Sequence, residues 1–124
     1  MGKEALIHVA RDGDIERVKM LLGLNMSTKI KDKYGWTTLH YVANGGHKDM
    51  VTLLLGKGAD VAATDNYGWM ALHYATHGGH DVVALLLDKG ADIAATDKAG
   101  WMAVHSAAYG GHKDVVALLK MQGA

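Results

Sequence analysis

The sequence lacks cysteine, proline and phenylalanine, and it has no excess of either charge. Without cysteine the chain can form no disulfide and offers no thiol chemistry, which suits a reducing compartment. The 13 lysines and arginines balance 13 aspartates and glutamates, so nothing favours binding to a phosphate backbone and we expect no nucleic-acid partner. The longest apolar run, Val82–Leu87, is far too short to cross a bilayer, so we expect no membrane partner either.

The first residues carry no recognisable targeting signal. Met1–Glu4 does not open a signal peptide, and Leu6 stands where a myristoylation motif needs serine or threonine. We therefore expect a soluble protein that is cytoplasmic or otherwise intracellular. The absence of proline from a loop-rich chain is unusual against an ordinary frequency of roughly 5%, and engineering and sequence drift are both consistent with it.

A repeat of about 33 residues runs through the chain. Gly-Trp pairs begin at Gly35, Gly68 and Gly100, which are 33 and 32 residues apart, and a Leu-His or Val-His pair follows each of them. Such a period predicts stacked helical units rather than one globular core, and it favours recognition over catalysis. We expect a single domain, 1–124, with a degenerate first repeat 1–31, repeats 32–64 and 65–96, and a truncated last repeat 97–124.

The unit 65–96 illustrates the structure expected of each repeat. Asp65–Gly68 predicts a turn, because Asp and Asn bond their own backbone and Gly permits a positive φ. A short helix over 71–77 is expected to end at a Gly-Gly pair, and a second helix over 81–89 to end at Gly90. Residues 91–96 are then expected to run extended. The second helix is apolar almost all round, so both of its faces must be covered.

Repeat 32–64 carries a longer set of marker residues, namely Thr37-Thr38-Leu39-His40, Ala43, Gly46-His47, Val51, Leu54-Leu55 and Gly58-Ala59-Asp60-Val61. With these residues the chain closely resembles the ankyrin repeat family, over roughly residues 5–124. The resemblance implies an all-α ankyrin-repeat solenoid, in which helix–turn–helix units joined by β-hairpin-like loops stack into an array with a concave recognition face. It also implies a non-catalytic monomer that binds a protein or peptide and needs no cofactor.

The chain departs from the family pattern in a few places. The family's Thr-Pro pair is replaced by Met70-Ala71 and Met102-Ala103, so only Thr37 keeps the hydroxyl that helps to hold the turn. One residue is missing before Asp81, which explains the shorter second interval. In the last repeat Lys120 replaces a leucine, which we interpret as a polar cap or a truncation at a tolerant place.

The eight histidines suggest a metal or catalytic cluster at first sight. The resemblance instead implies that His40, His73 and His105 hydrogen-bond the backbone between units. His73 and His77 are spaced i, i+4, which suits two ligands on one helix face, but no third ligand is forced nearby except His80. We therefore expect no metal site, and no nucleophile motif or phosphate loop points to an enzyme.

Aromatic residues repeat at the predicted loops. Trp36, Trp69 and Trp101 follow the turn glycines, at positions that the family varies to suit its partners. Exposed Trp and Tyr dominate the binding energy of many interfaces, but each Trp could instead pack on its neighbouring loop. The candidate partner-binding residues are Lys33, Tyr34, Trp36, Asn44, Asn66, Tyr67, Trp69, His77, Lys98, Trp101 and Tyr109.

Three functions stay open at this point. A protein-binding or peptide-binding module is the first. An engineered or structural ankyrin scaffold with no ligand of its own is the second, favoured by the repeated Trp and the absent proline. A small enzyme or metal-binding protein is the third and has the least support.

Overall fold

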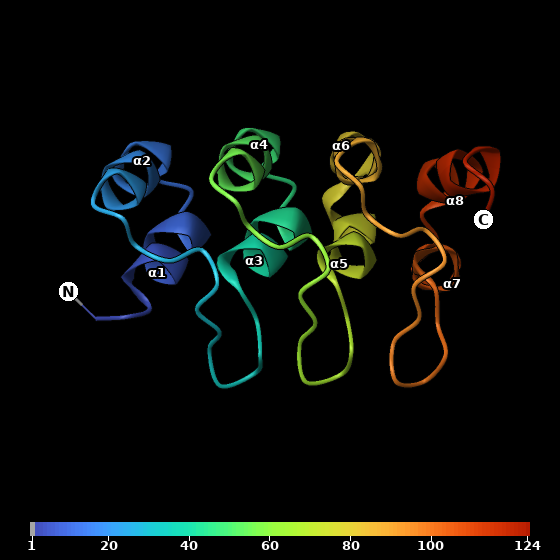
Figure 1. The fold of residues 1–124 in the computed structure, drawn as a ribbon. Helices are drawn as coiled ribbons and strands as arrows, with labels where there is room; N and C mark the ends of the chain where they lie inside the picture. Colours follow the sequence, from blue (N-terminus) through green and yellow to red (C-terminus); the bar gives the residue numbers. More distant parts are fainter. Residues whose placement is uncertain (1) are drawn as a thin grey trace.

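The computed structural model describes residues 2–124, which fold into eight α-helices arranged as four consecutive pairs (Figure 1). No strand occurs in this part of the chain, as the all-α ankyrin-type architecture predicts. The pairs are α1 (Ala5–Arg11) with α2 (Ile15–Gly23), α3 (Thr38–Asn44) with α4 (Lys48–Gly56), α5 (Ala71–Gly78) with α6 (His80–Asp88), and α7 (Ala103–Tyr109) with α8 (Lys113–Met121).

The helix pairs stack side by side in two layers. In the inner layer α1, α3, α5 and α7 each pack on the next, and in the outer layer α4 packs on α6 and α6 on α8. The long loops between pairs all project to the same side, below the inner layer in Figure 1. The result is an elongated row, with the two termini at opposite ends.

A line of leucines forms the centre of the outer layer. Leu54, Leu86 and Leu119 occupy equivalent places in α4, α6 and α8, and each is 0% exposed. Burial of one apolar side chain at every unit joins neighbouring repeats into one continuous core. Lys120, which takes the place of a leucine in the last unit, is exposed.

In three of the inner helices, α3, α5 and α7, a histidine in the first turn bonds the residue that precedes the helix. In α3 the Thr37 N–H donates to His40 Nδ1 (2.9 Å), and the Thr37 hydroxyl also caps the helix by accepting from the His40 N–H (3.4 Å). Met70 and Met102 cannot supply that hydroxyl, but their N–H groups still donate to Nδ1 of the histidine three residues on, at 3.1 and 2.9 Å. The starts of α5 and α7 therefore keep the bond from the backbone N–H to the histidine ring but lack the cap from a threonine hydroxyl.

The missing residue shortens the turn between α5 and α6 to Gly79 alone, whereas Gly45–His47 separate α3 from α4. Gly79 takes φ 110°, and a Cβ on Gly78 would lie 2.1 Å from the carbonyl oxygen of Ala43, so the end of α5 packs backbone against backbone on α3. Helix α6 starts one residue earlier than the predicted 81–89, because His80 directly follows the shortened turn and forms the first residue of the helix.

The stretch 91–96 was expected to be extended, and that expectation is wrong. A turn interrupts it at Ile93 and Ala94, because the Asp92 carboxylate accepts the N–H of Ala94 at 2.9 Å and the Asp92 carbonyl accepts the N–H of Ala95 at 3.2 Å. The hydrogen bond between the short Asp92 side chain and the nearby backbone favours a turn, and it outweighs the preference of the β-branched Ile93 for extended backbone.

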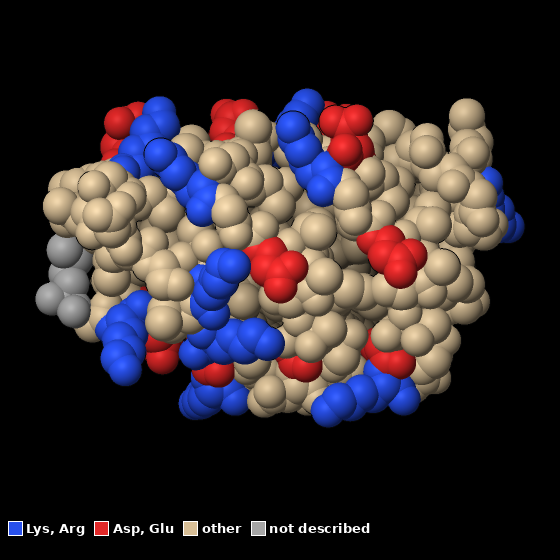
Figure 2. Space-filling view, in the orientation of Figure 1, with Lys and Arg blue, Asp and Glu red and all other residues tan. Residues whose placement is uncertain are grey.

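No helix among residues 2–124 combines the length and apolar character needed to cross a membrane. Basic and acidic side chains are interspersed over the face shown in Figure 2. This view agrees with the balanced composition and shows no broad surface of a single charge.

Candidate binding face

Each of the three long loops is built around one aspartate. Oδ1 of Asp32 accepts the N–H groups of Tyr34 (2.9 Å) and Trp36 (3.0 Å), and Oδ1 of Asp65 does the same for Tyr67 and Trp69, both at 2.9 Å. In the third loop Asp97 repeats the arrangement with the two equivalent N–H groups, at 2.8 and 2.9 Å. These contacts confirm the predicted Asp turn, and they fix where each Trp leaves the loop.

Backbone hydrogen bonds tie each loop to the next. The Asn66 N–H donates to the Tyr34 carbonyl and the Lys98 N–H donates to the Tyr67 carbonyl, both at 3.1 Å. The Asn66 side chain adds a bond to the Lys33 carbonyl at 3.1 Å. Asn66 is therefore partly a structural residue. The three loops, around Asp32–Trp36, Asp65–Trp69 and Asp97–Trp101, form one continuous surface, which we call the loop ledge.

The indoles of Trp36 and Trp69 pack against tyrosines of the inner helices, with the ring planes tilted by 46–48°. The Trp36 ring lies 4.6 Å from Tyr41 and 4.2 Å from Tyr74, and the Trp69 ring lies 4.8 Å from the other side of Tyr74, measured between ring centroids. The guanidinium of Arg11 covers Tyr41 at 4.8 Å. We call the series Tyr41, Trp36, Tyr74, Trp69 and Trp101 the aromatic ladder.

The tyrosines of the ladder are anchored by the loop aspartates. The hydroxyl of Tyr41 donates to Oδ2 of Asp32, and that of Tyr74 donates to Oδ2 of Asp65. Burial, followed by the hydrogen bond to Asp32 and its charge, raises the pKa of Tyr41 to about 12. Burial and Asp65 raise the pKa of Tyr74 in the same way. Each phenol therefore stays protonated and donates to its carboxylate.

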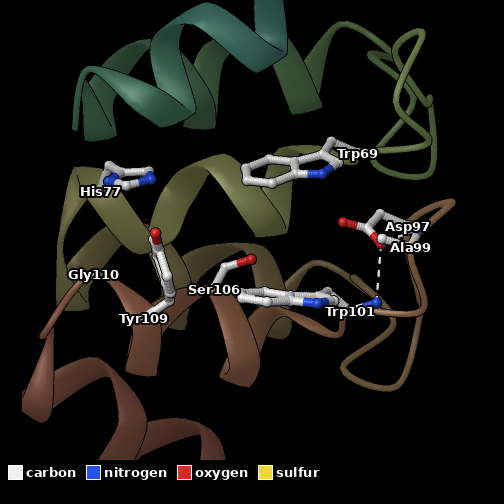
Figure 3. Close-up of a pocket in the computed structure, with 8 residues that line it drawn as sticks. All are labelled: Trp69, His77, Asp97, Ala99, Trp101, Ser106, Tyr109 and Gly110. Carbon is white, nitrogen blue, oxygen red and sulfur yellow. Dashed lines mark hydrogen bonds between the residues drawn. The ribbon is translucent and has the colours of Figure 1, made fainter.

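The ladder has a gap in the last repeat. Ser106 stands where repeats two and three have Tyr41 and Tyr74, and a pocket of about 490 Å³ opens between Trp69 and Trp101 (Figure 3). Ser106 Oγ is buried with no hydrogen-bond partner among residues 2–124. Asp97 lies at one end of the pocket, and His77, Tyr109 and Gly110 lie toward the other, as Figure 3 shows.

The Asp97 carboxylate is held in its charged form. Burial is the largest single influence and raises the pKa of Asp97, but N–H donors from Trp101, Ala99 and the Trp69 indole outweigh it together, so that the pKa lies below its ordinary value. The pocket thus combines aromatic walls with an anionic hydrogen-bond acceptor at one end.

The structure places nine of the eleven candidate residues at exposed positions and the other two, Trp36 and Trp69, at partly buried positions. Trp36 and Trp69 are only partly exposed, because the ladder tyrosines cover them. Tyr67 and Tyr109 are 69% and 86% exposed. The exposed candidates are Lys33, Tyr34, Asn44, Asn66, Tyr67, His77, Lys98, Trp101 and Tyr109.

Sequence reasoning missed the tyrosines of the ladder and the pocket-lining Ser106. The signal was available in the repeat itself, where one position reads Tyr41, Tyr74 and Ser106. Because Tyr pairs with the loop aspartate in repeats two and three, Ser106 in the last repeat marks the place where the loop aspartate lacks its phenol.

Two of the three inner-helix histidines, His40 and His73, link adjacent repeats, as the family resemblance implied, whereas the His105 ring bonds only Met102 of its own repeat. Nε2 of His40 donates to the Trp69 carbonyl and Nε2 of His73 donates to the Trp101 carbonyl, both at 3.0 Å. His73 therefore uses both ring nitrogens within the fold, and the His77 ring faces His112 at 5.3 Å instead. Residues 2–124 contain no group of three His, Asp or Glu side chains that could hold a metal ion.

We expect stability to depend on pH through His40. Burial lowers the pKa of His40 below its ordinary 6.5, so the unfolded chain takes up the proton first as the pH falls. Above pH 6.5 His40 is neutral in both states and has no effect on the pH dependence of stability. Below pH 6.5, toward the lowered pKa, the free energy of unfolding should fall. In urea melts at several pH values, the free energy of unfolding of His40→Gln should fall less steeply with decreasing pH than that of wild type.

His105→Gln is the matched control for this pH experiment. It removes the equivalent helix-start hydrogen bond, to Met102, from an exposed position. An identical pH slope in wild type and His40→Gln would contradict the role given to His40.

The three tryptophans should differ in their effect on stability. Trp36 contacts two ladder tyrosines, whereas Trp101 is 37% exposed and borders the pocket. We expect Trp36→Ala to lower the free energy of unfolding by about 1–2 kcal/mol more than Trp101→Ala, because truncation costs more where the packing is denser. Thermal melts of both variants measure this ranking, and equal losses would mean that the ladder does not stabilise the fold.

Comparison with known proteins agrees with the geometry. A family model described as ankyrin repeats (three copies) matches residues 6–97 and again residues 63–124. A search of curated proteins finds no match. Ankyrin repeats are generally protein–protein interaction modules and are typically non-catalytic. With helix pairs, loop turns and inter-repeat histidines all in place, and with the family model matching nearly the whole chain, this protein belongs to the ankyrin repeat family.

Proposed function

We propose that this array is a non-catalytic module that binds a protein or peptide across the loop ledge and the inner helices. The observation that carries the proposal is the group of exposed aromatic side chains on this side of the molecule. Tyr34 and Tyr67 on the loops are 54% and 69% exposed, and Tyr109 at the end of α7 is 86% exposed. Tyrosine contributes large contact area at low entropic cost, which suits recognition.

The proposal includes a setting and an assembly state. We expect the protein to act inside a cell, as ankyrin repeats commonly do, and to bind as a monomer, because stacking along the row satisfies each repeat through its own neighbours. The partner should be a protein rather than nucleic acid, since positive charge is matched by negative charge.

A scaffold with no ligand of its own is the second candidate, and one observation favours it. The indoles of Trp36 and Trp69 pack on Tyr74 inside the array, so the repetition of Trp is explained without any partner. Under this alternative, exposed aromatic residues such as Tyr109 could be removed without a functional loss.

Affinity capture with matched variants separates the two candidates. The binding-face variant carries Tyr34→Ala, Tyr67→Ala and Tyr109→Ala, and the control carries Ala at three exposed apolar residues of the outer helices and their ends, Met20, Leu24 and Met121, which are 54%, 62% and 84% exposed. All six changes lie at exposed side chains and should leave the fold intact.

We expect a protein that wild type and the control retain and that the binding-face variant loses, followed by the same ranking with the purified partner. Equal retention by all three proteins would contradict this binding face. Retention of nothing specific by any of them would favour the scaffold.

A further inference from the structure

The pocket between Trp69 and Trp101 has filled counterparts in the same molecule. In repeat three the ring of Tyr74 occupies the space between Trp36 and Trp69, at 4.2 and 4.8 Å from the two indoles. The next space along the ladder lies between Trp69 and Trp101, and there the position equivalent to Tyr74 carries Ser106. The fold therefore shows which group fits between two successive indoles, namely a phenol ring.

The polar end of the pocket is also matched by the filled repeats. Asp65 uses Oδ1 for the two loop N–H groups and Oδ2 for the Tyr74 hydroxyl. Asp97 makes the same two loop bonds through Oδ1, but among residues 2–124 no tyrosine hydroxyl donates to it. The Trp69 indole N–H is the side-chain donor to Asp97 instead, and Ser106 Oγ has no partner among residues 2–124, so the carboxylate can still accept the hydroxyl that a phenol would bring.

The chain does not fill this space itself. Tyr109 is the pocket's own phenol, but it is 86% exposed and its ring stands 5.6 Å from that of Trp101, along the edge toward His77 (Figure 3). The volume of about 490 Å³ holds more than one ring, so it leaves room for the backbone that carries the ring.

We propose that this pocket receives a tyrosine side chain of the protein or peptide partner, with its ring between Trp69 and Trp101 and its hydroxyl donating to Asp97. The inference rests on the proposed function, since it names the group by which a partner would be held. A ring held between two indoles gains from its contacts with both of them, and a charged acceptor strengthens the hydrogen bond. A phosphorylated tyrosine would bring its negative charge against Asp97, so the pocket should reject it.

The test uses small amides in place of the unknown partner. N-acetyl-L-tyrosinamide is titrated into the full chain, and tryptophan fluorescence is followed with excitation that tyrosine does not absorb. We expect a saturable change, with N-acetyl-L-phenylalaninamide binding roughly two- to tenfold more weakly, because it has no hydroxyl to donate to the Asp97 carboxylate. The phosphotyrosine amide should produce no saturable change.

Three variants locate the binding. Ser106→Tyr supplies the missing ring from the chain itself and should raise the melting temperature and abolish the saturable change. Trp101→Leu removes one wall at a position 37% exposed, so it keeps the test usable if Ser106→Tyr fails to fold, and it should weaken binding at least tenfold. Met121→Ala, on the outer helix α8, should bind as wild type does.

Each outcome decides a separate part of the proposal. No saturable change in wild type, or unchanged binding in a folded Ser106→Tyr or in Trp101→Leu, would overturn the pocket as a tyrosine site. Equal affinity for the tyrosine and phenylalanine amides would overturn the role of Asp97. If the amide binds as expected but affinity capture retains no protein, the pocket stands and the proposed function fails.

Discussion

Leu54→Ala and Leu86→Ala should each lower the free energy of unfolding by about 2–5 kcal/mol, the usual cost of truncating a fully buried leucine. Both side chains are 0% exposed, and they lie in α4 and α6, which pack on each other. In a stacked array no second core can compensate, because each unit is stabilised only by its own neighbours. Urea melts followed by circular dichroism measure the change.

Met121→Ala is the control for these core variants. Met121 ends α8 and is 84% exposed, so its truncation should change stability by less than about 0.5 kcal/mol. Losses near zero for Leu54→Ala and Leu86→Ala would mean that the outer helices do not form the core described above.

Tyr74→Ser should be the most damaging change on the inner side, with an expected loss of about 3–5 kcal/mol, as for a buried aromatic side chain. The substitution places at position 74 the residue that the last repeat has at the equivalent position, Ser106. It empties the space between Trp36 and Trp69 and leaves Asp65, which is 5% exposed, without the phenol that bonds it. The loss of the donor to one oxygen of this buried carboxylate, Oδ2, adds to the cost of the cavity.

Tyr67→Ser provides the matched comparison, because the same chemical change falls on a side chain that is 69% exposed. We expect it to leave the melting temperature nearly unchanged. Similar losses for Tyr74→Ser and Tyr67→Ser would show that the ladder contributes nothing beyond surface contact.

Much of the fold could be predicted from the sequence because its signals are local and repeat. The Gly-Trp pairs set the period, the aspartates marked the turns, and the leucines of the second helices required cover on both faces. The local structure of the degenerate first repeat was also predictable, since Asn25 takes a positive φ of 64° where other repeats use Gly.

The candidate site was less predictable because it depends on contacts between repeats. Whether Trp69 is covered depends on a tyrosine of the inner helix, and the pocket depends on the absence of one at Ser106. Neither follows from helix or turn propensity, which reports only on near neighbours in the chain. Local competition also misled the prediction for residues 91–96, where the Asp92 side chain forms a turn.

The chain contains three tryptophans, so a nitrogen–proton NMR spectrum has three indole signals, and these test the central claim directly. On addition of N-acetyl-L-tyrosinamide to the full chain, the signals of Trp69 and Trp101 should shift together in a saturable way, because these two indoles form the walls of the pocket. The signal of Trp36, whose neighbouring space is already filled by Tyr74, should stay in place. Equal shifts of all three signals, or a shift of Trp36 alone, would contradict a vacant tyrosine site in the last repeat.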